Sequence, residues 1–278
     1  MFPATVTLSV TLLVPALAVF PLAFTNWTFG SVSIEWVGLA NFIEFLSDPF
    51  SRRALTNTII YVLVTVPLTV IFGLAAAVLI DSLPFGKSFF RAVYFLPVVS
   101  TFVAMATVWQ IMLHPTVGIL NQILAIFGIE GLNWLQDESL VLPVLCAIGI
   151  WENLGFVMVL FIAGLRSIPR DFYEAASVDG VKSGWGQFVT VTWPLLGPTT
   201  LFVVVISAIR SFRVFESVAV LTGGGPSRAS EVLLYTIFHE GFGLLRVGYA
   251  SAVTLIFLGL LSIVTILQVF LADRRVHY

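Results

Sequence analysis

The sequence predicts an all-α integral membrane protein with six transmembrane helices. The chain of 278 residues is 59% hydrophobic, only 10% of its residues are charged, and its mean hydropathy is +1.04. Soluble domains are closer to half apolar and a quarter charged, so a water-soluble fold could not bury this much apolar surface. Six apolar runs are each long enough, at about 20 residues, to cross a hydrocarbon layer as a helix.

The six runs follow one another along one predicted domain, residues 1–278. The first is interpreted as a span rather than a signal peptide, because no basic segment precedes it and no small-x-small cleavage site precedes Asn26. The second contains Pro67, a kink that packed neighbouring helices can accommodate. The predicted spans are residues 5–25, 58–80, 93–113, 140–165, 195–220 and 248–271.

Basic residues in the loops predict the orientation. Six spans place both termini on one side, and cytoplasmic loops carry the excess of Lys and Arg. The loops on the side of the termini hold seven basic residues: Lys87, Arg91, Arg166, Arg170, Lys182, Arg274 and Arg275. The opposite loops hold four: Arg52, Arg53, Arg228 and Arg246. We therefore expect a multi-pass protein of the cytoplasmic membrane with both termini in the cytoplasm.

Several classes of function are excluded by composition and spacing. A net charge of -2 argues against a nucleic-acid partner. Gly86-Lys87-Ser88 does not make a phosphate-binding loop, because the position that this motif requires to be glycine is Asp81. Cys146 lies in an apolar run and the three histidines lie in separate loops. We expect no catalytic residue, no metal and no nucleotide bound by this chain.

Polar residues inside two predicted spans are candidates for a solute path. An ionisable group at membrane depth costs several kcal/mol unless it faces a partner or water. Arg210, Arg213 and Glu216 follow one another at intervals of three, a spacing that predicts one helical face shared with Ser207. Two compatible interpretations stay open: structural pairing, as of Glu152 with Arg210 or of Arg213 with Glu216, or a polar wall along a path. The candidates are Trp151, Glu152, Asn153, Ser207, Arg210, Arg213 and Glu216.

Three consecutive glycines, Gly223–Gly225, follow the fifth predicted span. They allow a sharp turn where the chain leaves the membrane. Alternatively, their backbone amides could form an anion-binding nest. The sequence leaves both interpretations open.

The connection between the fourth and fifth spans, residues 166–194, is longer than a plain link requires. It predicts a helix that runs to about Val178 and is ended by Asp179 and a left-handed Gly180. Asp171 and Glu174 suit the positive N-terminal end of that helix. Small residues on its surface favour docking into a groove of another protein over a mere connector.

At this connection the sequence resembles a known family. The residues Glu174-Ala175-Ala176, with Gly180 four positions on and Pro194 opening the next span, are similar to the cytoplasmic EAA loop of bacterial ABC-importer permeases. The stretch 163–180 resembles the carbohydrate-importer branch. The segment 221–226, LTGGGP, resembles the MalF/UgpA-type subunit rather than its MalG-like companion. So do Trp109-x-x-Met112, Gly118-x-x-Asn121 and Asn133-Trp134-Leu135.

The resemblance departs from the family in two places. The spacer from Gly180 to Pro194 is one residue longer than usual, and Trp193 replaces the usual leucine. These departures leave the helix register after Gly180 undetermined. They do not alter the identity of the loop.

The resemblance implies a type I ABC importer permease core in a bacterial or archaeal membrane, surrounded by lipid. It implies a heterodimer with a MalG-type permease, two ATPase subunits that hold ATP and Mg, and an extracytoplasmic solute-binding protein. Glu174, Ala175, Ala176, Asp179 and Gly180 would form the coupling helix. The implied cargo is a sugar or oligosaccharide.

Two alternatives to this function stay open. Arg210 and Arg213 could serve an anionic solute such as glycerol phosphate or a phosphodiester, because arginine forks suit phosphate. A chain of another class, a stand-alone secondary transporter or channel, would move solute without partners. The docking helix favours the ABC importer, since a solitary transporter does not need one.

Overall fold

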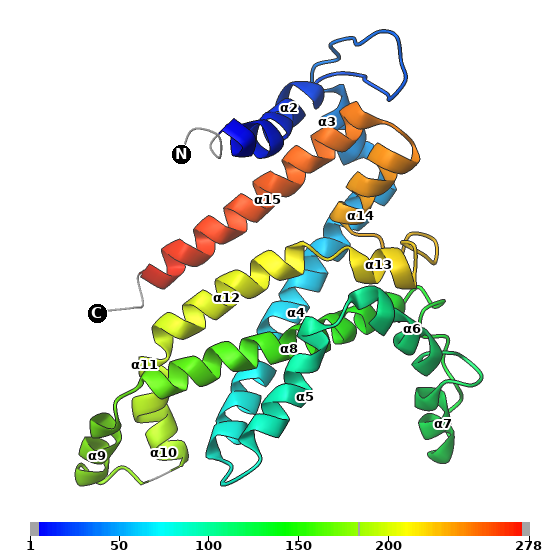
Figure 1. The fold of residues 1–278 in the computed structure, drawn as a ribbon. Helices are drawn as coiled ribbons and strands as arrows, with labels where there is room; N and C mark the ends of the chain where they lie inside the picture. The colour runs from blue at the N-terminus through cyan, green and yellow to red at the C-terminus, as the bar shows by residue number, and fades with distance from the viewer. Residues whose placement is uncertain (1–5, 183, 274–278) are drawn as a thin grey trace. The chain divides into compact units, whose positions relative to one another are not determined.

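The computed structural model describes residues 6–182 and 184–273 of the chain, and all regular elements within these ranges are helices (Figure 1). Their only β-pairing is an isolated bridge between Thr25 and Trp36. Of the predicted features, Thr5 at the start of the first span and the basic pair Arg274 and Arg275 lie outside the described residues.

The described chain divides into two compact units. The first comprises residues 6–60, 133–142 and 213–263; the second comprises 61–132, 143–212 and 264–273, apart from residue 183. The helices of the first unit are η1 (Ser9–Leu13), α2 (Val14–Leu22), α3 (Ala40–Ser47), α4 (Pro49–Ser82), α13 (Glu216–Leu221), α14 (Leu233–Phe238), η3 (His239–Gly243) and α15 (Val247–Asp273). Of these, α4 and α15 continue into the second unit. The other helices of the second unit are α5 (Lys87–Val99), α6 (Phe102–Met112), α7 (Ile119–Ile126), α8 (Val141–Ser167, which begins in the first unit), α9 (Arg170–Val178), α10 (Trp185–Gln187), η2 (Phe188–Thr192), α11 (Trp193–Leu195) and α12 (Gly197–Phe212).

Three helices among the described residues are long and apolar enough to cross a membrane. They are α4, α8 and α15, at the positions of the second, fourth and sixth predicted spans. The number rises to five if each of two bent helix pairs forms one span. At the first predicted span the helix covers only Val6–Leu22 before the chain turns.

The third predicted span, 93–113, is not one straight helix. α5 and α6 meet at 101° across Ser100 and Thr101, whose backbones are extended. Pro97 lies in the last turn of α5, where its missing N–H removes a helical hydrogen bond and weakens the helix just before the bend. Residues 93–113 therefore belong to a bent helix pair, which can still form one span.

The fifth predicted span, 195–220, is also interrupted. α12 ends at Phe212 and α13 begins at Glu216, so the face predicted through Arg210, Arg213 and Glu216 is not continuous. Charge favours this break: Arg210 lies in the last turn of α12 at the negative end of the helix dipole, and Glu216 lies in the first turn of α13 at the positive end.

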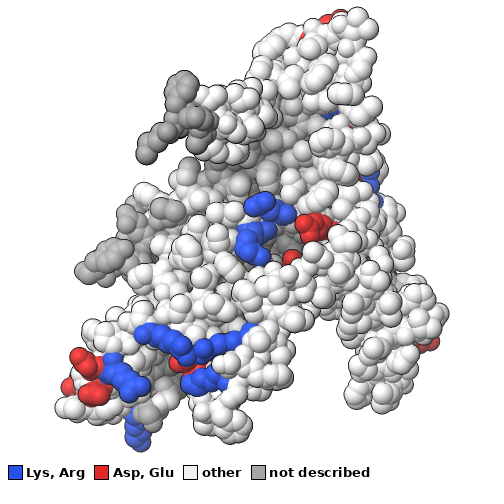
Figure 2. All heavy atoms as spheres, viewed as in Figure 1, with Lys and Arg blue, Asp and Glu red and all other residues white. Residues whose placement is uncertain are grey.

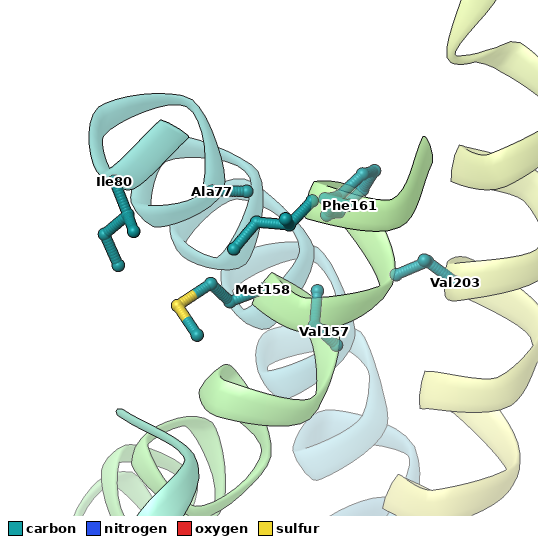
Figure 3. Close-up of a cluster of buried hydrophobic side chains, with 7 residues drawn as sticks. Ala77, Ile80, Val157, Met158, Phe161 and Val203 are labelled. Atoms are coloured by element: carbon teal, nitrogen blue, oxygen red, sulfur yellow. The ribbon is translucent and has the colours of Figure 1, made fainter. Parts of the chain in front are cut away.

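The core of the second unit forms where α4, α8 and α12 meet (Figure 3). Ala77 and Ile80 of α4 pack against Met158 and Phe161 of α8, and Val203 reaches the same cluster from α12. Small residues let the backbones approach closely, as in other membrane helix pairs. A Cβ on Gly155 of α8, for example, would lie 1.9 Å from the carbonyl oxygen of Tyr94 in α5.

Candidate functional site

Helix α9 is closed at its C-terminus by a complete Schellman motif. Gly180 adopts φ +83°, the left-handed conformation that the sequence predicts for it. The Gly180 N–H donates to the Ser177 carbonyl at 3.1 Å, and the Val181 N–H donates to the Ala176 carbonyl at 2.9 Å. Val181 also packs on the apolar cluster that contains Ala176, which is the hydrophobic contact that accompanies this motif.

The two faces of α9 have different environments. Ala176 is 8% exposed and packs with Ile168, Val191 and Leu196 of its own chain. Glu174, Ala175, Asp179 and Gly180 are exposed. Two large apolar residues are exposed as well, Phe172 at 50% and Val178 at 88%. Among the predicted coupling residues, Ala176 therefore holds the helix in place and the other four are accessible.

Hydrogen bonds brace α9 against the segment that leads into α12. The hydroxyls of Tyr173 and Thr192 lie 3.0 Å apart, and Gln187 Nε2 donates to Ser177 Oγ at 2.9 Å. In Figure 1, α9 and α10 lie beside each other at one end of the second unit, with α11 leading into α12. A displacement of α9 would therefore be passed to α12 through its braces and the helical segment between them.

A π-helical turn in this segment accounts for the long spacer. η2 runs from Phe188 to Thr192, and the Trp193 N–H donates to the Phe188 carbonyl five residues back. A π-helical turn holds one more residue than an α-helical turn, so it takes up an inserted residue without rotating the helices on either side. This turn resolves the register that the sequence left undetermined after Gly180.

Asp81 at the end of α4 organises the neighbouring charges. Its carboxylate lies 3.4 Å from Arg91 of α5 and 3.4 Å from Arg166 of α8, and its carbonyl accepts a hydrogen bond from Lys87 Nζ. A cavity of about 700 Å³ lies here; it is lined by Asp81, Lys87, Leu165, Arg166, Ile168, Arg170, Tyr173 and Glu174. Figure 2 shows charged side chains gathered over this end of the second unit and a second group near the C-terminal part of α12.

Inside the predicted spans the structure brings Arg210 and Asn153 together. Arg210 Nε donates to Asn153 Oδ1 at 2.8 Å, and its guanidinium carbon lies 4.6 Å from the centroid of the Phe156 ring. Among the described residues, the ion pair that the sequence suggested between Arg213 and Glu216 is not formed.

The other candidate path residues are not on one face. Ser207 is 4% exposed, so it does not share the exposed face of Arg210. Trp151 is 36% exposed and packs edge-to-face on Trp109 of α6, with ring centroids 5.3 Å apart. Within the second unit, the best-defined contacts of the candidate path residues are therefore those that Arg210 makes with Asn153 and Phe156.

Residues 50–277 match the family described as "Binding-protein-dependent transport system inner membrane component". The match covers well over half of the chain. The chain belongs to this family.

Relatives named as permeases are similar to this permease over most of their length. The probable ABC transporter permease protein YurN of Bacillus subtilis is 34% identical over 89% of this chain and 86% of its own. The sn-glycerol-3-phosphate transport system permease protein UgpA of Agrobacterium fabrum is 32% identical over 89% and 84%. The lactose transport system permease protein LacF of Rhizobium radiobacter is 30% identical over 98% and 92%.

Solved structures share the fold of the permease. A chain of a bacterial ABC transporter involved in the import of the acidic polysaccharide alginate superposes with a TM-score of 0.85 over 99% of this chain and 94% of that chain. A chain of the alginate transporter in complex with its alginate pentasaccharide-bound periplasmic protein gives a TM-score of 0.82 over 98% and 91%. At 22% identity these likenesses establish the helical ABC-permease fold, and not the cargo.

The glycine-rich segment of the permease forms a turn. Gly223 and Gly224 have positive φ. The Gly223 N–H donates to the Val218 carbonyl, the Gly224 N–H to Thr222 Oγ1, and the Gly225 N–H to the Thr222 carbonyl. Because these amides are used within the chain, they are not free to bind an anion. Of the two interpretations that the sequence left open, the structure favours the turn.

Sequence reasoning missed two features of the site. Asp81 entered only as a residue that breaks a phosphate-loop motif, yet it ties together three helix ends. Phe156 lies three residues after Asn153, and this helical spacing was the available signal for its place beside Arg210. In the part of the chain that the structure describes, no group of three or more His, Cys, Asp or Glu could hold a metal ion.

Proposed function

We propose that this permease is one of two different membrane subunits of an ATP-driven, binding-protein-dependent importer. Its partners are a MalG-type second permease, two cytoplasmic ATPase subunits and an extracytoplasmic solute-binding protein. The chain crosses the membrane six times with both termini in the cytoplasm, so that the first apolar helix and each bent pair count as crossings. It forms half of the solute pathway.

In this proposal α9 is the coupling helix. The observation that supports this role is that one side of α9 is buried against the permease and the other is exposed. Ala176 fixes the inner side of α9 to the permease, whereas Phe172, Glu174 and Val178 present an exposed apolar and acidic surface. An exposed amphipathic helix of this kind suits a groove in a partner protein. The ATPase subunit supplies that groove and holds ATP and Mg, while this chain binds neither.

Coupling then works as a population shift between inward-facing and outward-facing states. ATP and the loaded binding protein each prefer the outward-facing state. A shift from 1:99 to 99:1 takes about 5.5 kcal/mol of differential binding, which two ligands can share. Movement of α9 passes through its bonds to Gln187 and Thr192 into α12, whose last turn carries Arg210.

The proposed cargo is a sugar or an oligosaccharide. Relatives of this length and identity include a lactose permease, and the fold is shared with a transporter of a polysaccharide. Arg210 and Asn153 would face the solute from α12 and α8. Other relatives are named for sn-glycerol-3-phosphate transport.

Charge reversal at Glu174 tests the coupling assignment. Glu174→Lys should lower ATP-driven uptake by the reconstituted complex by about tenfold or more, because hydrogen bonds to charged groups contribute about 1.5–3 kcal/mol. Stimulation of ATP hydrolysis by the binding protein should fall with it, while the amount of assembled complex stays the same. Glu130→Lys, a matched reversal at an exposed glutamate away from α9, should change neither activity. Normal uptake and stimulation in Glu174→Lys would refute the coupling role.

A further inference from the structure

Among the described residues, the groups that fix Arg210 in place are neutral. Its Nε donates to Asn153 Oδ1, and its guanidinium stacks over Phe156. Asn153 is itself held, because its Nδ2 donates to the Gly149 carbonyl one helical turn back at 2.9 Å. This second bond sets which end of the Asn153 amide faces Arg210. The arginine is therefore oriented by its neighbours without its charge being neutralised.

Other arginines of the chain contact carboxylates. Arg246 contacts the carboxylates of Glu44 and Glu240, and Arg53 contacts Glu138 at 3.2 Å. None of the ion pairs that the described residues form involves Arg210. Arg210 nevertheless lies in the last turn of α12, a helix of apolar character, and its side chain is exposed.

A guanidinium in this position suits a negative partner. An unpaired charge at membrane depth costs several kcal/mol, so such residues face a partner or a water-filled path. Arginine presents a planar fork of donors that matches a carboxylate or a phosphate with two parallel hydrogen bonds. With Nε bound to Asn153, the two terminal nitrogens Nη1 and Nη2 are left to form that fork.

We propose that the solute carried along this path is acidic, a saccharide that bears a carboxylate or a phosphate, and that Arg210 binds its acidic group in passage. The inference rests on the proposed function, since it assigns the chemical class of the cargo to the same pathway. Asn153 and Phe156 are positioning residues that hold the fork toward the solute. A neutral sugar would offer the exposed Arg210 fork no charged group to bind.

The experiment uses the whole complex in proteoliposomes, with the companion permease, the ATPase and the binding protein. The vesicles, loaded with ATP, are exposed to a mixture of neutral oligosaccharides, oligouronates and sugar phosphates, and the accumulated compounds are identified by mass spectrometry. We expect only acidic compounds to accumulate, and their identity separates carboxylates from phosphates. Arg210→Gln should lower their uptake at least about tenfold at subsaturating concentration, from the loss of hydrogen bonds to a charged partner. Arg210→Lys should retain part of it.

Two controls separate binding of an acid from a structural role. Arg53→Gln removes an arginine that already has a carboxylate partner in the first unit, and it should leave uptake unchanged. The amount of Arg210→Gln complex assembled with the companion permease and the ATPase should equal that of the wild type. ATP-driven accumulation of neutral sugars, or acidic uptake that is indifferent to Arg210→Gln, would overturn this inference and leave the importer function standing. If ATP drives the accumulation of nothing, the proposed function itself fails.

Discussion

Gly180 is a residue whose backbone decides the shape of the coupling segment. At φ +83° a side chain is strained, yet a Cβ there would meet nothing within 4 Å. Left-handed backbone costs an ordinary residue about 1–2 kcal/mol. Glycine is therefore favoured at position 180 because of its left-handed backbone, and not because a side chain would meet a neighbouring atom.

Gly180→Val should loosen the end of α9 and lower uptake, while insertion and assembly persist. The expected loss is about fivefold to thirtyfold if the 1–2 kcal/mol of strain is relieved by leaving the functional conformation. Gly197→Val is the matched control, because a Cβ at Gly197 also meets nothing within 4 Å and its φ is ordinary. Initial rates of ATP-driven uptake measure both variants, and equal losses in the two would contradict the role of the left-handed turn.

Glu231 is a nearly buried carboxyl outside the membrane helices, at 3% exposure. Burial raises its pKa, although Thr236 Oγ1 donates to it at 2.9 Å and Arg228 lies 3.5 Å away. An acid with a raised pKa binds its proton more tightly in the folded state. Its stabilising contribution is therefore present at low pH and is lost as the pH rises through the folded-state pKa.

Glu231→Gln should reduce the loss of folding stability that accompanies rising pH. Glutamine keeps an oxygen for the Thr236 hydroxyl and carries no charge to bury. Thermal unfolding of the purified complex between pH 4 and pH 8, roughly the window above the usual glutamate pKa, should show the wild type losing more stability with rising pH than the variant. Parallel curves would show that the burial of this carboxyl does not govern the slope.

At the scale of elements, the π-helical turn η2 accommodates the extra residue of the spacer between Gly180 and Pro194 without changing the register of the helices around it. The residue before the turn and the last residue of the turn both have partners on α9: Gln187 bonds to Ser177, and Thr192 bonds to Tyr173. An extra residue in an α-helix would rotate one of these two sides by about 100°. The π-helical turn confines the insertion to exposed positions such as Thr190.

Deleting Thr190 should therefore be tolerated. The deletion converts η2 into an α-helical turn and leaves the flanking registers unchanged, so assembly and uptake should stay within about twofold of the wild type. Deleting Val204 inside α12 is the matched control: it rotates Ser207 and Arg210 relative to the rest of that helix, and it should abolish uptake. Equal damage from the two deletions would contradict the π-helical account.

The helices that could be predicted from the sequence are those set by uninterrupted apolar runs. α8 and α15 begin and end within two residues of the predictions 140–165 and 248–271, and α9 ends at Val178 as predicted. The break at 213–215 contains no proline or glycine, so local propensity could not reveal it. The hydrogen-bond partner of Arg210 could not be predicted from the sequence either. Whether Asn153 or Glu152 faces Arg210 depends on the rotation of α8 about its axis relative to α12.

At the scale of the whole molecule, the permease is a subunit whose function depends on chains outside it. Its family and its fold place it among the membrane components of binding-protein-dependent transport systems. The proposed partners divide the work: an ATPase holds nucleotide, a binding protein selects solute, and this chain with its companion forms the path. A secondary transporter would combine path and driving force in one chain.

ATP-driven accumulation in proteoliposomes tests this account most directly. The complete complex with its binding protein should accumulate solute only when ATP is present. This chain alone should move none, whether under an ion gradient or with ATP added. Accumulation by the chain alone, driven by an ion gradient and unaffected by Glu174→Lys, would contradict the account and identify a stand-alone transporter.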